Sequence, residues 1–204
     1  TEYIGYIDFR TLAILFCLMT VMAGLQKLGI FRRVARILLQ HTHNVIALAE
    51  ILVLLCFFFS MLITNDVALI TFVPFTFTVL RLSGEDAVRR LAVPVVVLQT
   101  IAANLGSMLT PIGNPQNLYL YGKMQMPPIA FIRLMLPYST VSLLLLLICT
   151  VVAAKHSGIA VRDVAGALQA EDAGQETAGW RRHLSVFYLI LFLLCLLTVA
   201  HVIP

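Results

Sequence analysis

Long apolar runs separated by short polar segments follow one another along the chain. The runs are residues 11–29, 45–63, 67–80, 91–122, 134–154 and 184–203. The fourth run has no Asp, Glu, Lys, Arg or His in 32 positions. A membrane-spanning helix needs about 20 apolar residues, so this pattern predicts membrane helices and no β-sheet.

Two of the intervening segments have their own character. Residues 30–41 place their apolar side chains on one helical face and their arginines elsewhere, which is typical of a basic amphipathic helix on an anionic membrane surface. Residues 155–183 are rich in Ala, Gly and Glu and are predicted to form a solvated cytoplasmic loop.

The region 45–80 is too long for one straight crossing and is interrupted by the triplet Thr64-Asn65-Asp66. The run 67–80 corresponds to about 21 Å of helix, which is too short to cross alone. Two topologies follow. One is a kinked single crossing, and the other is a re-entrant helical hairpin with the triplet at its tip.

The distribution of basic residues separates these topologies. With a hairpin, 11 of the 14 Lys and Arg residues face one side of the membrane, and 3 face the other. With a single crossing the split is 6 to 8, which carries no orientation signal. Because cytoplasmic loops are enriched in Lys and Arg, we favour the cytoplasmic hairpin.

Composition excludes a soluble protein and several classes of function. Of the 204 residues, 60% are hydrophobic and 12% are charged, against about 45–50% and about 25% in soluble domains. The net charge of +4 is explained by basic loops, so no nucleic-acid partner is expected. We find no nucleophile–base pair and no metal-ligand spacing, so the sequence predicts neither an enzyme nor a cofactor.

Two polar breaks carry the candidate chemistry. The first is the triplet at 64–66, and the second interrupts the fourth run at residues 111–117. Asp66 is placed to cap a helix that begins near Val67, and Asn114 to cap one that begins at Pro115. Two helix N-termini in one cavity suit an anion, while the preceding carbonyls suit a small cation. This architecture predicts a secondary transporter.

The sequence around both breaks resembles the divalent anion/sodium symporter family of the ion transporter superfamily, which includes citrate carriers and arsenite permeases. Residues 60–66 resemble the family's first hairpin with its Ser-Asn-Thr tip, and residues 104–117 resemble its Gly-Thr-Pro-Pro-Asn loop. The resemblance implies a homodimer in which a mobile domain moves past a fixed scaffold in an elevator motion.

The resemblance also implies roles for individual residues. The cation site would be formed by Ser60, Thr64, Asn65 and Gly113. The substrate site would be formed by Asn65, Asp66, Asn114, Pro115 and Asn117. Asp66 stands where the carboxylate carriers have Thr, and the arsenite permeases have a similar Asn-Asp pair. It is expected to be protonated, paired with a cation or turned away as a helix cap, and it raises proton coupling as an option.

The family has an inverted repeat, and only one hairpin and one broken helix are found here, so we expect the chain to be one half of such a carrier. The predicted parts are a scaffold segment at 1–44, a transport segment at 45–154 (hairpin 45–81, broken helix 91–122, span 133–154), a cytoplasmic loop at 155–183 and a span at 184–204 that belongs to the second half or the scaffold.

The sequence thus predicts an all-α, multi-pass protein of the bacterial inner membrane that moves a small anion, a carboxylate or other oxyanion, coupled to Na⁺ or H⁺. Its expected partners are the solute, the lipid bilayer, a second copy and the missing C-terminal repeat. The alternatives are an arsenite or metalloid efflux permease, a cation/proton antiporter, and a non-transporting membrane subunit or degenerate half-transporter.

Overall fold

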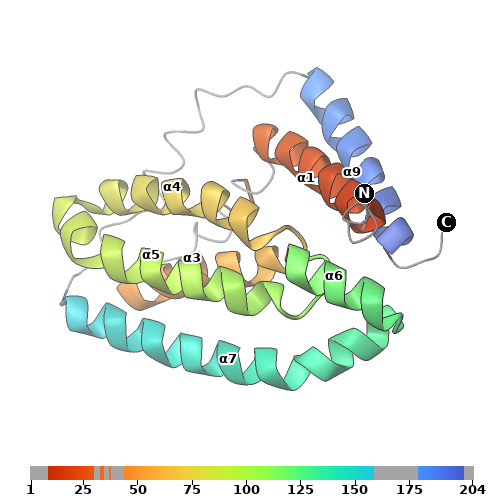
Figure 1. The fold of residues 1–204 in the computed structure, drawn as a ribbon. Coiled ribbons are helices and arrows are strands. Elements are labelled where there is room, and N and C mark those ends of the chain that lie inside the picture. The colour runs from red at the N-terminus through yellow and green to blue at the C-terminus, as the bar shows by residue number, and fades with distance from the viewer. Residues whose placement is uncertain (1–8, 30–32, 35–36, 38–43, 159–178, 200–204) are drawn as a thin grey trace, which may run out of the picture.

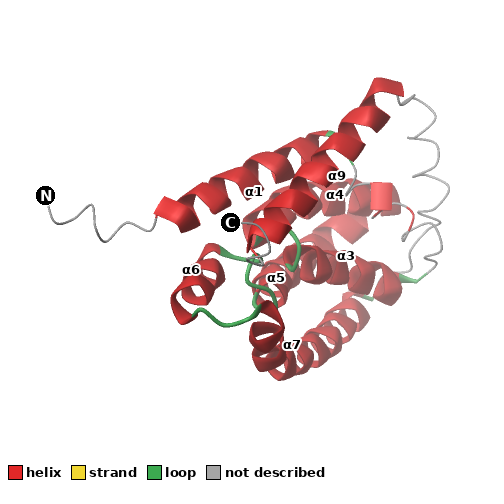
Figure 2. Cartoon of the chain, turned by 90° about the vertical axis from the view of Figure 1, so that its right-hand side faces the viewer, coloured by secondary structure: helices red, strands yellow, loops and turns green. Residues whose placement is uncertain are grey.

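The computed structural model of the chain describes residues 9–29, 33–34, 37, 44–158 and 179–199. These residues form helices joined by turns and contain no strand (Figure 2). The helices are α1 (Phe9–Lys27), α3 (Val45–Ser60), α4 (Asn65–Ser83), α5 (Glu85–Ser107), α6 (Pro115–Met124), α7 (Pro128–Ser157) and α9 (Gly179–Val199). The all-α class predicted from the apolar runs is confirmed.

Local sequence signals explain where several helices begin and end. The Asn44 side chain accepts a hydrogen bond from the Ile46 backbone N–H at 3.1 Å and so caps α3. Pro115 occupies the first turn of α6, where its missing N–H costs nothing. Gly158 ends α7 in the left-handed region, with φ of 63°, which a residue without a Cβ adopts readily.

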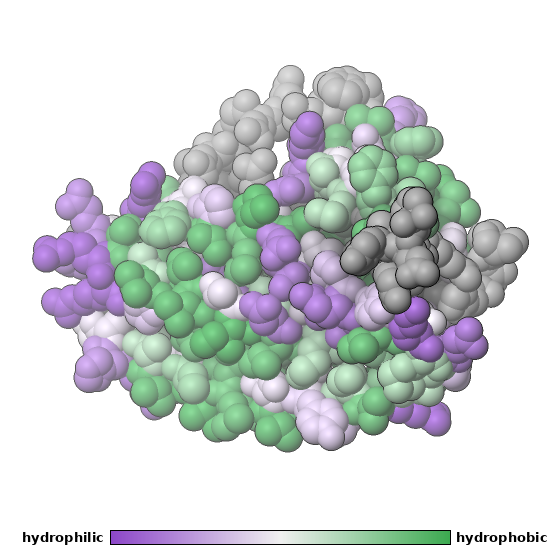
Figure 3. Space-filling view, in the orientation of Figure 1, coloured by the Kyte–Doolittle hydropathy of each residue, from purple (hydrophilic) through white to green (hydrophobic). Residues whose placement is uncertain are grey.

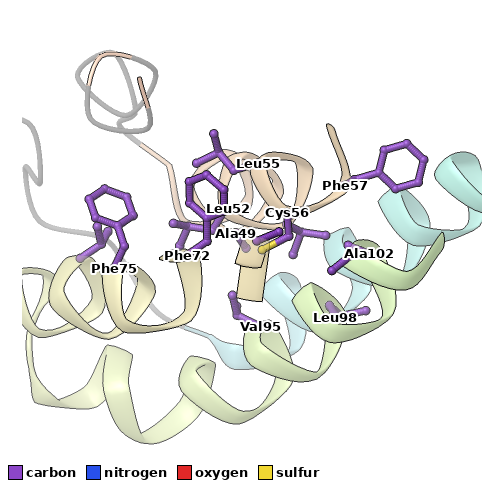
Figure 4. Packing of buried hydrophobic residues seen from close by; sticks show 14 of the residues in the cluster. Ala49, Leu52, Leu55, Cys56, Phe57, Phe72, Phe75, Val95, Leu98 and Ala102 are labelled. Atoms are coloured by element: carbon purple, nitrogen blue, oxygen red, sulfur yellow. The ribbon is translucent and has the colours of Figure 1, made fainter. Parts of the chain in front are cut away.

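Helix α5 lies at the centre of the main bundle and packs against α3, α4 and α7 (Figure 1). The core between α3, α4 and α5 is built from close-packed aliphatic and aromatic side chains (Figure 4). Leu52 and Cys56 of α3, Phe72 of α4 and Ala102 of α5 are fully buried in it. These three helices therefore form one packed unit, which carries both polar breaks at one of its ends.

A buried polar contact also holds this unit together. The side chain of Gln99 on α5 is fully buried, and its Nε2 donates to the Leu52 carbonyl of α3 at 3.0 Å and to Thr76 Oγ1 of α4 at 2.7 Å. A single amide thus links three helices. In a membrane, where water does not compete for these groups, such bonds contribute to helix association.

Helices α1 and α9 lie side by side, at an angle to the main bundle (Figures 1 and 2). Their contact includes Gly24 of α1, where an added Cβ would lie 2.3 Å from the Tyr188 ring of α9. The absence of a side chain at Gly24 therefore allows the two helices to approach closely. Helix α9 covers most of the span predicted at 184–204 and packs on α1, and the assignment of this span to the scaffold or to the second half stays a prediction.

Three of the described helices, α4, α5 and α7, are long and apolar enough to cross a membrane. The expectation that the second arm of region 45–80 is too short to cross is wrong, because the helix begins at Asn65 and continues to Ser83, giving 19 residues. The polar residues at its ends were excluded from the predicted run but take part in its first and last turns. The re-entrant topology therefore stays a prediction that rests on the charge distribution alone.

The remaining predicted segments are found with extended bounds or lie outside the described residues. The broken helix predicted at 91–122 starts earlier, at Glu85, because the charged residues before the apolar run form the first two turns of α5. The span predicted at 133–154 extends over Pro128–Ser157. Most of the surface helix predicted at 30–41 and residues 159–178 of the predicted loop lie outside the described residues.

Candidate functional site

The two polar breaks contact each other directly. Residues 61–64 form the turn between α3 and α4, and residues 108–114 form the loop between α5 and α6. The backbone N–H of Asn65 donates to the Gly113 carbonyl at 3.2 Å, and Thr110 Oγ1 donates to the Met61 carbonyl. Segments about 50 positions apart in the sequence are thus hydrogen-bonded into one site.

A third contact joins the side chains of Asn65 and Asn104. Asn65 Nδ2 donates to Asn104 Oδ1 at 3.0 Å, and Asn104 Nδ2 donates to the Thr100 carbonyl one turn earlier on α5 at 2.8 Å. Asn104 was not among the residues predicted to form the site. The structure places it beside the predicted site residue Asn65.

Asn114 caps the N-terminus of α6, as predicted. Its Oδ1 accepts the backbone N–H of Asn117 at 2.7 Å, while its Nδ2 donates to Ser107 Oγ at 3.3 Å. Both ends of its amide are therefore occupied by the protein. Its neighbour Pro115 is half-buried in the first turn of the same helix.

The Asn117 side chain binds the backbone carbonyls at the C-terminal end of α5. Its Nδ2 donates to the carbonyls of Ser107, Met108 and Thr110 at 3.1–3.2 Å. Carbonyls at a helix C-terminus have no partner within the helix, so a side-chain donor stabilises them. Asn117 therefore has a structural contact in addition to its predicted role in substrate binding.

Two glycines allow this close approach. A Cβ on Gly113 would lie 2.2 Å from the Ser107 carbonyl oxygen. A Cβ on Gly106 would lie 2.0 Å from the Phe57 carbonyl oxygen of α3 and 2.6 Å from Ser60 Oγ. Neither position has room for a side chain, so both glycines are required by the packing of the breaks.

The hydroxyl groups predicted to bind a cation are buried beside the α3–α4 turn. Ser60 is fully buried, and its Oγ donates to the Phe57 carbonyl at 2.8 Å. Thr64 is only 6% exposed, and its Oγ1 has no hydrogen-bond partner in the described structure. Asn65 Oδ1 is also buried without a partner there. Two buried oxygens on adjacent residues thus lie at the start of α4 without a hydrogen-bond partner in the described structure.

The predicted capping role of Asp66 is wrong. Helix α4 begins at Asn65, and Thr64 occupies the N-cap position, although its side chain makes no capping bond. Asp66 lies in the first turn and is exposed. Within the described residues, no hydrogen bond or ion pair holds its carboxylate. A negative charge at this position is stabilised by the N-terminus of the helix.

The surface at these breaks differs from the surface of the helices around it. Apolar side chains cover most of the visible face, and hydrophilic side chains gather at the end that carries the α4–α5 turn (Figure 3). A second hydrophilic patch interrupts the apolar face where α5 ends and α6 begins (Figure 3). Within the described part of the chain, no cluster of His, Cys, Asp or Glu suited to a metal ion is found. The polar groups that the two breaks contribute are hydroxyls, amides and carbonyls, together with the Asp66 carboxylate.

Long apolar helices arranged around two hydrogen-bonded breaks are typical of an integral membrane protein, and breaks of this kind are common in membrane transporters. A family model described as citrate transporter matches residues 1–204. The chain belongs to this family, which confirms the transporter resemblance inferred from the two break motifs.

Relatives among known proteins agree with this assignment. The chain is 38% identical to an Escherichia coli inner membrane protein, YbiR, over 144 residues, or 70% of the chain and 37% of the relative. It is 29% identical to an uncharacterized transporter of Methanocaldococcus jannaschii, MJ0456, over 72% of the chain and 40% of the relative.

A third relative is a silicon efflux transporter of rice, LSI3, which is 33% identical over 64% of the chain and 26% of its own length. The chain therefore aligns with two fifths or less of each of these relatives. No solved structure matches it significantly.

Proposed function

We propose that this chain provides one half of the binding site of a secondary active transporter that moves a small anion coupled to Na⁺ or H⁺. The observation that carries the proposal is the hydrogen-bonded meeting of the α3–α4 turn with the α5–α6 loop. Irregular backbone within a membrane is tolerated where protein or a water-filled cavity satisfies it, and such breaks are where transporters bind their solutes.

The start of α4 supports a site for the coupling ion. Thr64 Oγ1 and Asn65 Oδ1 are buried oxygens without protein donors, so a cation would supply the partner that they lack. Uncharged oxygen ligands suit a small hard cation such as Na⁺. Ser60 and the Gly113 carbonyl lie in the same part of the fold and complete the proposed set.

The starts of α4 and α6 support an anion site. Both helices begin at the paired breaks, so the partial positive charges of their N-termini lie near each other. Asn65, Asn114, Pro115 and Asn117 belong to these first turns or their caps. A carboxylate or other oxyanion is the kind of group that helix N-termini bind.

The arrangement of helices supports the proposed elevator motion. Helices α3, α4, α5 and α7 pack as one bundle that carries both breaks, while α1 and α9 pack mainly on each other. We propose that this bundle moves relative to a scaffold that includes the α1–α9 pair. The second half of the binding site would come from the C-terminal repeat, and two copies of the protein would form a homodimer.

Transport into liposomes tests the proposal. The whole protein that carries this chain is reconstituted, and uptake of labelled citrate, succinate, phosphate and sulfate is measured under a Na⁺ gradient, a pH gradient or neither. We expect accumulation of one anion class under one of the gradients only. Equal fluxes with and without a gradient would contradict coupling, and the absence of flux for every solute would favour a non-transporting subunit.

Efflux of an uncharged metalloid acid is a second candidate. It is favoured by the exposed Asp66 carboxylate in the first turn of α4, which would repel an anionic substrate. The similarity to a silicon efflux transporter points the same way. Such a solute carries no charge to repel, and Asp66 would then bind the coupling proton.

A further inference from the structure

Two side-chain amides form a short chain of hydrogen bonds from the backbone of α5 to the start of α4. The Thr100 carbonyl accepts from Asn104 Nδ2 at 2.8 Å. Asn104 Oδ1 then accepts from Asn65 Nδ2 at 3.0 Å. The chain crosses from one broken element to the other, so it links the orientation of Asn65 to a rigid helix.

The direction of this chain is fixed at its beginning. A backbone carbonyl only accepts hydrogen bonds, so Asn104 must turn its NH₂ group toward Thr100. Its Oδ1 is then directed toward Asn65, where it requires a donor. Asn65 must therefore direct its own NH₂ group toward Asn104, and Asn65 Oδ1 points away from Asn104.

The oxygen that points away from Asn104, Asn65 Oδ1, belongs to the candidate cation site. Asn65 Oδ1 is buried without a partner, and so is Thr64 Oγ1 of the preceding residue, which is 6% exposed. If the Asn65 amide were turned by 180°, its NH₂ group would take the place of the oxygen and repel a cation. The orientation of this amide thus decides whether the site attracts a cation.

We propose that Asn104 is a positioning residue for the coupling cation: it fixes the Asn65 amide so that Asn65 Oδ1 is presented beside Thr64 Oγ1. This inference rests on the proposed cation coupling and adds to it a residue that contacts Asn65 but not the ion. Because the amide is oriented before the cation arrives, binding does not have to order it.

Sodium binding to the purified protein tests this role without a transport assay. Thermal unfolding is followed at increasing NaCl with choline chloride holding ionic strength constant, and the rise in melting temperature gives an apparent Kd for Na⁺. Asn104→Leu removes the acceptor and is expected to weaken Na⁺ binding roughly tenfold, the value of about one lost hydrogen bond. Its melting temperature in choline separates this effect from a loss of folding.

Two matched variants make the test specific. Asn104→Asp loses the bond to the Thr100 carbonyl but keeps an oxygen that accepts from Asn65 Nδ2, so it is expected to bind Na⁺ more tightly than Asn104→Leu. Thr100→Ala removes a hydroxyl whose single hydrogen bond among the described residues goes to the Val96 carbonyl, and it keeps the backbone oxygen used by Asn104. It is expected to bind Na⁺ with unchanged affinity.

The outcomes distinguish the two proposals. Sodium affinity within twofold of normal in Asn104→Leu, or equal losses in Asn104→Leu and Asn104→Asp, would overturn the positioning role and leave sodium coupling in place. An unmodified protein that gains no stability from Na⁺ would overturn both.

Discussion

The backbone N–H of Asn65 donates a hydrogen bond to the carbonyl of Gly113 at 3.2 Å. This bond joins the first residue of α4 to the loop that precedes α6, 48 positions further along the chain. The backbone at the start of α4 and the backbone before α6 are therefore fixed relative to each other, and a change in either loop displaces both.

Replacing Gly113 by Ala is the first test of this relationship. The new Cβ would lie 2.2 Å from the Ser107 oxygen, so the loop must shift away from the end of α5. We expect the free energy of unfolding to fall by about 1–3 kcal/mol, as for other overpacked sites, and transport to be lost. Chemical unfolding in detergent and uptake in liposomes measure the two effects.

Gly122→Ala is the matched control. Gly122 is an exposed residue inside α6, where Ala is favoured over Gly by about 1 kcal/mol. This variant is expected to be as stable as the unmodified protein or more so. Equal destabilisation by the two variants would contradict the steric argument for Gly113.

Asn117 provides a test of the hydrogen bonds at the end of α5. In Asn117→Asp the donor that serves three carbonyls is replaced by an oxygen that repels them. We therefore expect Asn117→Asp to lower the free energy of unfolding more than Asn117→Ala, which itself costs about 1–3 kcal/mol. Gln116→Glu introduces the same charge one residue earlier, at an exposed position near the helix N-terminus, and should be neutral or slightly stabilising.

The buried link between α4 and α5 is tested by a double-mutant cycle. Gln99→Leu and Thr76→Val each remove one partner of the 2.7 Å bond. We expect the effects on unfolding free energy to be non-additive, with a coupling of about 0.5–1.5 kcal/mol. Thr78 is the control, because its hydroxyl bonds within the described part of the chain to the Pro74 carbonyl of its own helix alone, and Thr78→Val should show no coupling to Gln99.

Asp66 separates the two candidate functions. If Asp66→Asn abolishes pH-driven transport while sodium-dependent binding remains, the carboxylate binds the coupling proton. If transport of a dicarboxylate is unchanged or improved, the carboxylate has no part in coupling and the anion hypothesis gains. Asp86→Asn is the matched control, because Asp86 is also an exposed acid in the first turn of a helix, α5, away from the breaks.

The breaks themselves were predictable because their residues act locally. Asn114 and Pro115 specify a cap and a first helical turn through contacts within four residues, and the structure starts α6 at the predicted residue. The start of α4 was placed two residues late, because Asp66 is a good capping residue by type, although Thr64 occupies that position.

Other contacts of the site depend on distant residues and were beyond local reasoning. Nothing in the neighbourhood of Asn104 indicates that its acceptor faces Asn65, because the two residues are 39 positions apart. Likewise, Gly106 has an ordinary helical conformation, and its role is visible only once the Phe57 carbonyl of α3 is placed against it. Family resemblance identified the segments but not these partners.

The pairing of α1 with α9 has a consequence for how the chain is assembled. Helix α1 precedes the bundle in the chain, yet its main packing partner among the described helices, α9, follows the bundle. The bundle of α3, α4, α5 and α7 has its internal contacts available as soon as residue 157 is synthesised, before α9 is made. Contacts between segments far apart in sequence form slowly because loop closure must precede them. The face of α1 around Gly24 therefore lacks its packing partner, the Tyr188 side chain, until α9 has been synthesised.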